Sequence, residues 1–170
     1  DASNLERINR WQSAFRMFLE RPVFGWGPGT YQFVYAPFQR SQERTIISTN
    51  AGDLGNAHSE YIGPLSEQGI PGLMIILVMM STILYTGIKV FRQARDKQIK
   101  LFSLLAVLSL CTYFVHGLLN NFLDTDKASV PFWGFFAMIV AMDIYHKETV
   151  NISASEDKED LAEHTDRMDD

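Results

Sequence analysis

The stretch QGIPGLMIILVMMSTILYTGI, residues 68–88, decides the fold of this chain. It contains no charged residue and is bounded by Glu67 and Lys89. A helix needs about 20 apolar residues to cross the ~30 Å hydrocarbon core of a bilayer. The stretch therefore predicts a membrane span over about residues 70–90, and Pro71 suits the first turn of that helix because its missing N–H is not needed there.

Two further apolar stretches follow in the sequence. Residues 101–123 are uncharged and rich in Leu, Val and Phe, and they predict a second span. Residues 128–142 are shorter, so the third span must extend over about residues 128–145 to cross the bilayer. The sequence thus predicts an all-α, polytopic membrane protein with about three transmembrane helices within residues 69–146.

Basic residues crowd the connection between the first two spans, with Asp96 alone opposing them: Lys89, Arg92, Arg95, Lys97 and Lys100. Short loops rich in Lys and Arg face the cytoplasm. Residues 1–68 are then expected to form an extracytoplasmic loop, which is periplasmic if the membrane is a bacterial inner membrane. The end of the chain is expected to return to the cytoplasm.

The acidity of the chain comes from its last segment. Residues 147–170 contain 3 Lys or Arg against 9 Asp or Glu, a charge of −6, whereas the whole chain carries −5. Such an acidic segment with little apolar content is typical of a disordered tail. The net charge therefore does not indicate a cationic partner for the rest of the chain.

The segment before the first span divides into three parts. The first is predicted to be a helix that Pro22 ends, because its apolar residues fall within one arc: Leu5, Ile8, Trp11, Phe15, Phe18 and Leu19. The sequence VFGWGPG, residues 23–29, then requires turns. Residues 30–56 show no sustained period and are interpreted as a surface loop.

Arg7 and Arg10 lie on a neighbouring arc of the predicted helix. Guanidinium groups bind phosphate oxygens in bidentate fashion and stay charged at all relevant pH values, so both are candidates for binding a diphosphate. The alternative is a solvated helix face with Glu6 and Glu20 as partial partners. Arg40 and Arg44 are further basic candidates, in the predicted loop.

His58 is the strongest titratable candidate, because an unperturbed imidazole titrates near neutral pH and can accept a proton. It follows a Gly- and Asn-rich stretch shortly before the membrane entry. A helix cap or a surface histidine is the alternative. Glu60 and Glu67 could orient the imidazole or a sugar hydroxyl, or they could be solvated, and Tyr61 is a further possible supporting residue.

Several classes of protein are disfavoured. The chain has no Walker loop, no dinucleotide-binding glycine fingerprint and no Asp-x-Asp pair, which argues against nucleotide-dependent enzymes, and no nucleic-acid partner is expected. Cys111 is the single cysteine, and no zinc spacing is present. We therefore expect no metal and no cofactor.

Three ordered motifs carry a resemblance to a known family. They are Arg7-x-x-x-Trp11, then Pro22-x-x-Gly25-x-Gly27-x-Gly29, then Ala57-His58-Ser-Glu-Tyr61-x-x-x-Leu65-x-Glu67-x-Gly69-x-x-Gly72 at the entry to an apolar helix. This set closely resembles the O-antigen ligase and polymerase superfamily, over roughly residues 4–145. The family usually has Asn after the histidine, whereas Ser59 stands here.

The resemblance implies a multi-span, GT-C-like glycosyltransferase of the bacterial inner membrane that is metal-independent and inverting. Such enzymes transfer a glycan from undecaprenyl diphosphate to an acceptor hydroxyl. The resemblance favours an O-antigen ligase with a lipid A-core acceptor, in lipopolysaccharide or surface polysaccharide biosynthesis. A repeat polymerase and a protein O-oligosaccharyltransferase are the alternatives. By motif position, it implies Arg7 as a diphosphate contact and His58 as the base.

Two other classes of function stay open at this stage. The chain could be a fragment of a transporter, or a noncatalytic membrane scaffold that uses its acidic tail for binding. The resemblance implies more spans upstream, and the chain opens with Asp-Ala-Ser-Asn, so we expect it to be part of a longer membrane protein.

Overall fold

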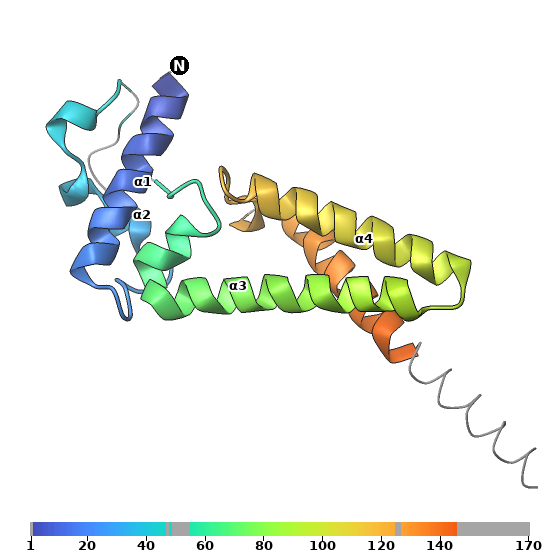
Figure 1. Ribbon diagram of the computed structural model, residues 1–170. Helices are drawn as coiled ribbons and strands as arrows, with labels where there is room; N and C mark the ends of the chain where they lie inside the picture. The colour runs from blue at the N-terminus through green and yellow to red at the C-terminus, as the bar shows by residue number, and fades with distance from the viewer. Residues whose placement is uncertain (1, 47, 49–54, 125–126, 146–170) are drawn as a thin grey trace, which may run out of the picture. The chain divides into compact units, whose positions relative to one another are not determined.

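The structure is a computed structural model that describes residues 2–46, 48, 55–124 and 127–145 (Figure 1). The predicted acidic tail, residues 147–170, lies outside the described residues. The elements in chain order are α1 (Ala2–Glu20), α2 (Tyr31–Val34), η1 (Ala36–Phe38), η2 (Ser41–Glu43), α3 (Ile62–Gln93), α4 (Lys97–His116), η3 (Phe122–Asp124) and a last helix, Lys127–Tyr145.

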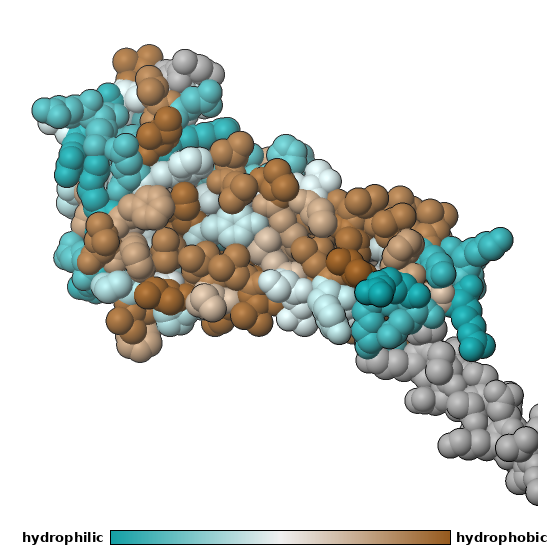
Figure 2. Space-filling view, in the orientation of Figure 1, coloured by the Kyte–Doolittle hydropathy of each residue, from teal (hydrophilic) through white to brown (hydrophobic). Residues whose placement is uncertain are grey.

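Three of these helices are long and apolar enough to cross a membrane: α3, α4 and Lys127–Tyr145. Figure 2 shows hydrophobic side chains over α3 and α4, and hydrophilic ones over the turn that joins them. Many large apolar side chains on these helices are exposed, such as Val78 at 58%. A bilayer accepts such a surface, whereas water does not. The predicted all-α, polytopic membrane class is confirmed.

The helix bounds differ from the predicted spans at two places. Helix α3 begins at Ile62, but its backbone is non-helical at Gly69 (φ 67°, ψ −157°), so the straight part starts close to the predicted residue 70. Helix α4 ends at His116 rather than at Leu123. There the Gly117 carbonyl accepts a hydrogen bond from the Glu60 N–H (2.9 Å) instead of continuing the helix.

The predicted surface loop, residues 30–56, also differs from the structure. Its described part contains three short helices, α2, η1 and η2. Tyr31 and Tyr35 of this segment are buried, with stacked rings 5.1 Å apart. They share a core with Ala14 and Met17 of α1. Hydrophobic periodicity missed these elements because each is only three or four residues long.

The chain packs as two compact units. Of the described residues, the first unit comprises those within 2–82 and 111–132, and the second comprises 83–110 and 133–145. In the second unit, the Ser103 hydroxyl donates to the Gly87 carbonyl (2.8 Å). Lys89 pairs with Asp143 at 3.4 Å. A Cβ on Gly87 would lie 2.4 Å from a Val107 methyl, so α3 and α4 approach closely there.

In the first unit, the glycine-rich segment after α1 is fastened to the bend of α3. The Gly27 N–H donates to the Glu67 carbonyl (2.7 Å), and the Ile70 N–H donates to the Pro22 carbonyl (3.0 Å). Gly25 and Gly69 both have positive φ, and a Cβ on Gly25 would lie 2.3 Å from the Glu67 carbonyl carbon. Only glycine allows this approach of two backbones.

Candidate functional site

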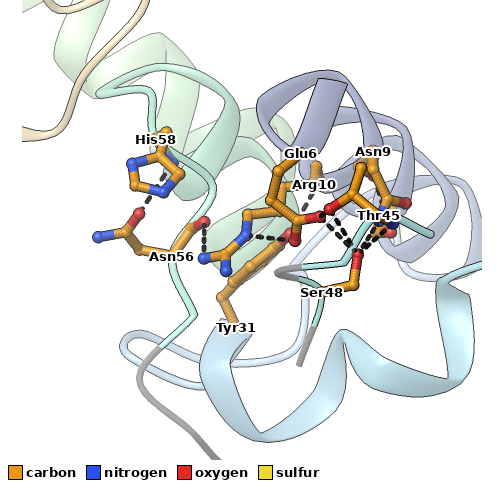
Figure 3. A network of polar contacts seen from close by, with 9 residues as sticks. Glu6, Asn9, Arg10, Tyr31, Thr45, Ser48, Asn56 and His58 are labelled. Carbon is orange, nitrogen blue, oxygen red and sulfur yellow. Dashed lines mark hydrogen bonds and ion pairs between the residues drawn. The ribbon is translucent and has the colours of Figure 1, made fainter. Parts of the chain in front are cut away.

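The site starts from a buried polar network on α1 (Figure 3). Glu6 is 4% exposed. Its carboxylate accepts hydrogen bonds from Arg10 Nε (3.0 Å), from Thr45 Oγ1 (2.7 Å) and from Ser48 Oγ. Burial raises the pKa of Glu6, but the hydrogen bonds from Ser48, Thr45 and Arg10 outweigh it and leave the pKa below its ordinary value. The carboxylate is therefore ionised at neutral pH and holds Thr45 and Ser48 against α1.

Arg10 connects this network to the loop that carries His58. Its side chain is buried, its Nη1 donates to the Asn56 carbonyl (3.4 Å), and its guanidinium lies 5.9 Å from the centre of the Tyr35 ring. The Tyr31 hydroxyl donates to the Arg10 carbonyl (2.8 Å). Arg10 and Glu6 form an ion pair (3.0 Å) that is buried, not part of a solvated helix face.

His58 occupies an unusual backbone conformation. Its φ of 47° lies in the left-handed region, and among the described residues it is the one non-glycine residue with positive φ. Such a conformation is disfavoured for a side chain with a Cβ and is retained where surrounding contacts fix it. Here the His58 N–H donates to Asn56 Oδ1 (3.1 Å), as Figure 3 shows. The flanking residues Ala57 and Ser59 are both buried.

The residues after His58 are held by the end of α4 within the same unit. Ser59 Oγ accepts from the N–H groups of Tyr61 (3.3 Å) and Ile62 (3.4 Å), which caps the start of α3. The Tyr61 hydroxyl donates to the Phe114 carbonyl (2.8 Å). Together with the Glu60–Gly117 backbone bond, these contacts fix the His58 loop from its C-terminal side.

The two predicted supporting carboxylates make other contacts. Glu60 Oε1 accepts from the Tyr113 hydroxyl and from the Leu123 N–H, both at 2.8 Å. The Glu67 carboxylate accepts from the N–H groups of Gly29 and Tyr31, both at 2.9 Å. Each carboxylate therefore joins segments distant in sequence. Burial, followed by the charge of Glu60, raises the pKa of Tyr61, so its hydroxyl stays protonated.

Two of the predicted arginines act on the pKa of His58. Burial is the largest cause that lowers the His58 pKa, and the positive charges of Arg10 and Arg7 lower it further, whereas Glu6 acts in the opposite direction. The imidazole is accordingly neutral at pH 7, the state that can accept a proton. The positive charges of Arg7 and Arg10 thus both act on the His58 imidazole.

Arg7 and Arg10 differ in what they can offer to a ligand. Arg10 is buried and bound to Glu6 and Asn56. Arg7 is half-buried, and it makes no hydrogen bond or ion pair with the residues that the structure describes. Of the two guanidinium groups, only that of Arg10 is engaged by residues that the structure describes.

Arg40 and Arg44 lie elsewhere. Both are exposed, and they flank η2. The pKa of Glu43 is lowered chiefly by its hydrogen bonds from Arg16, and the charge of Arg40 lowers it further. The structure does not bring either arginine into the electrostatic environment of His58.

A cleft of about 490 Å³ adjoins the His58 loop in the first unit. Its lining includes Asn56, Ala57 and Ser59, but not His58 itself. Two of its amide side chains, Gln32 and Gln68, were not among the predicted site residues. No sequence signal marks them, since isolated glutamines in a loop and in a helix are ordinary. Among the described residues, no group of three or more His, Cys, Asp or Glu side chains is arranged to hold a metal ion.

One family model matches the part of the chain that carries this site. Residues 1–77 match the model of a family described as O-antigen ligase. The matched segment runs from α1 through the glycine-rich turns and the His58 loop into α3. No curated protein and no solved structure matches the chain.

Proposed function

We propose that this chain, which belongs to the O-antigen ligase-like superfamily through residues 1–77, transfers a glycan from undecaprenyl diphosphate to an acceptor hydroxyl. The observation that carries the proposal is a neutral, half-buried imidazole, His58, held in a strained loop beside the cations Arg7 and Arg10. A proton acceptor next to a diphosphate-binding cation is what this transfer needs.

In the proposed reaction, the acceptor hydroxyl oxygen attacks the anomeric carbon of the glycan. The bond between that carbon and the diphosphate oxygen breaks on the opposite face, so the anomeric configuration inverts. The hydroxyl proton passes to the imidazole of His58, and general-base help of this kind contributes roughly 10²–10⁴-fold. Diphosphate is a good leaving group, so no general acid is required.

The two arginines have different roles in this proposal. Arg7 binds the diphosphate and stabilises the negative charge that develops on the bridging oxygen. Arg10 contributes its positive charge and holds the Asn56 carbonyl, which positions the loop. A bound diphosphate would offset the arginine charges that lower the His58 pKa, so donor binding would make the imidazole a stronger base.

The proposed setting is the bacterial inner membrane. The basic connection between α3 and α4 would face the cytoplasm under the positive-inside rule, which leaves residues 1–68 periplasmic. The expected acceptor is lipid A-core, as for an O-antigen ligase, and the proposed chemistry uses no metal and no cofactor.

Glycan ladders from a deletion strain show whether the acceptor is lipid A-core or a growing repeat unit. Loss of all surface attachment with intact carrier-linked polymer supports a ligase, whereas attachment of single repeats indicates a polymerase.

The test uses the purified full-length protein in lipid nanodiscs with undecaprenyl-diphosphate-linked glycan, a hydroxyl acceptor and EDTA. We expect a covalent glycan–acceptor product of inverted anomeric configuration and an equal amount of free undecaprenyl diphosphate. Movement of the intact lipid-linked glycan across a vesicle membrane, without a covalent product, would instead support the transporter alternative.

A further inference from the structure

The cleft beside the His58 loop has three walls in the first unit. They are formed by parts of residues 28–32, 55–60 and 63–68, with Asn121 at one side. The Glu67 carboxylate joins the first wall to the third through the N–H groups of Gly29 and Tyr31. Its volume, about 490 Å³, falls within the ~300–1,000 Å³ typical of small-molecule sites.

The described lining is polar but contains no cation. Among the residues that the structure describes, no Lys, Arg or His lines the cleft, so its described part is not suited to the diphosphate. Its two carboxylates, Glu60 and Glu67, are engaged with protein hydrogen-bond donors. What remains open to a ligand is a set of uncharged polar groups, with Pro28 and Pro64 supplying apolar surface.

Gln32 and Gln68 are the groups that point to a ligand. Both are half-buried, they come from different walls, and neither makes a hydrogen bond with the part of the chain that the structure describes. A primary amide offers two donors and one acceptor. Vicinal sugar hydroxyls both donate and accept hydrogen bonds, so two such amides match one ring.

The cleft also lies at a fitting place along the chain. It contacts the residues immediately before and after His58, but not His58 itself. A sugar held there would therefore be a neighbour of the reacting sugar and not the reacting sugar itself.

We propose that this cleft is a subsite for an uncharged sugar ring of the glycan donor or the glycan acceptor, one position removed from the reaction. The inference rests on the proposed glycan transfer. It adds that different residues bind the two parts of the substrate. Amides of the cleft bind the sugar hydroxyls, and Arg7 binds the diphosphate.

The experiment compares Gln32→Met, Gln68→Met and their double variant with wild type in full-length protein. Methionine keeps the unbranched shape but removes the hydrogen-bonding groups. Gln42→Met is the matched control, because Gln42 is exposed on η2 and outside the cleft. Each lost neutral hydrogen bond should lower kcat/KM by roughly 3- to 10-fold. The loss should appear in KM, and the pH profile should stay unchanged.

Two arms of this experiment identify the source of the sugar. A raised KM for the lipid-linked donor places a donor sugar in the cleft, and a raised KM for the acceptor places an acceptor sugar there. Inhibition by a sugar-free polyprenyl diphosphate should be the same in wild type and in the Gln variants, because the arginines are intact. Gln32→Asn and Gln68→Asn, which keep the amide, provide a milder second pair if a methionine variant is unstable.

Unchanged KM values for both substrates in the double variant would overturn the subsite. The same holds if Gln42→Met has an equal effect. Neither result would contradict the proposed glycan transfer. That transfer depends on His58 and is tested by substitution of His58.

Discussion

The His58 side of the first unit and the helix packing of the second unit are held together in different ways. Around His58, loops are fixed by hydrogen bonds to backbone groups, such as Glu60 N–H to the Gly117 carbonyl and Gly27 N–H to the Glu67 carbonyl. In the second unit, the described contacts are mainly apolar, with buried Val90, Leu110 and Ile139. Backbone hydrogen bonds require one conformation, whereas apolar packing accepts swaps that conserve volume. The first region should therefore be the more sensitive to single substitutions.

The largest effect on stability is expected at Gly25. A Cβ there would lie within 2.6 Å of three backbone atoms of Glu67 and Gln68, and φ is positive. Gly25→Ala should cost more than about 3 kcal/mol, because a strained backbone alone costs ~1–3 kcal/mol. Gly29→Ala is the matched control, since its φ is also positive but nothing lies within 4 Å of a Cβ. Thermal unfolding in detergent measures both, and equal losses would refute the close approach.

A smaller effect is expected from Glu67→Gln. Both carboxylate oxygens accept from backbone N–H groups, and the amide can replace only one of them. Because hydrogen bonds to charged groups contribute roughly 1.5–3 kcal/mol, we expect a loss of about that size. Glu20→Gln, at an exposed position, should leave the unfolding temperature unchanged. A stable Glu67→Gln protein that has lost only activity would assign Glu67 to catalysis instead.

Substitution of Arg7 should change the pH dependence of transfer. The reaction needs neutral His58, so the rate should fall as pH drops through a pKa below the ordinary value of 6.5. Arg7→Gln removes a positive charge that lowers this pKa, so the acid limb of kcat/KM should move to higher pH. Arg95→Gln, in the basic connection, should leave the limb in place. If the acid limb of kcat/KM stays at the wild-type pH in Arg7→Gln, the charge of Arg7 does not act on the His58 pKa.

The smallest effect is expected on the exposed surface of the second unit, on the helix Lys127–Tyr145. Val140 is 47% exposed, and lipid should accept a leucine there, so Val140→Leu should change stability by less than about 0.5 kcal/mol. Unfolding in nanodiscs measures it. A loss above 1 kcal/mol, in the range of an overpacked core, would show that this surface packs against another part of the protein, and the contrast between the two regions would weaken.

The sequence predicted the membrane helices because length and hydropathy are local properties. A third span was predicted within residues 128–145, and the described helix Lys127–Tyr145 is long and apolar enough to cross a membrane. The predicted second span, residues 101–123, extends beyond the end of α4 at His116. The helix ends where the Gly117 carbonyl accepts a hydrogen bond from the Glu60 N–H, 57 residues earlier in the chain. Local hydropathy contains no information about such a partner.

The candidate site also combines residues that the sequence could indicate with contacts that it could not. Arg7, Arg10 and His58 were proposed as site residues from their residue types and motif positions, and the charges of both arginines lower the pKa of His58. The contacts of Glu6 with Thr45 and Ser48, and of Glu67 with Gly29 and Tyr31, could not be predicted. They join loop residues that follow no period, so only the folded chain brings them together.

The most direct measurement of the central claim is the rate of glycan transfer by His58→Ala in full-length protein, with donor binding measured in parallel. We predict a fall of roughly 10²–10⁴-fold in rate, the usual contribution of a general base, with the membrane level and the donor affinity retained. A transfer rate close to that of wild type would contradict the account, because the proposed reaction passes the hydroxyl proton to His58.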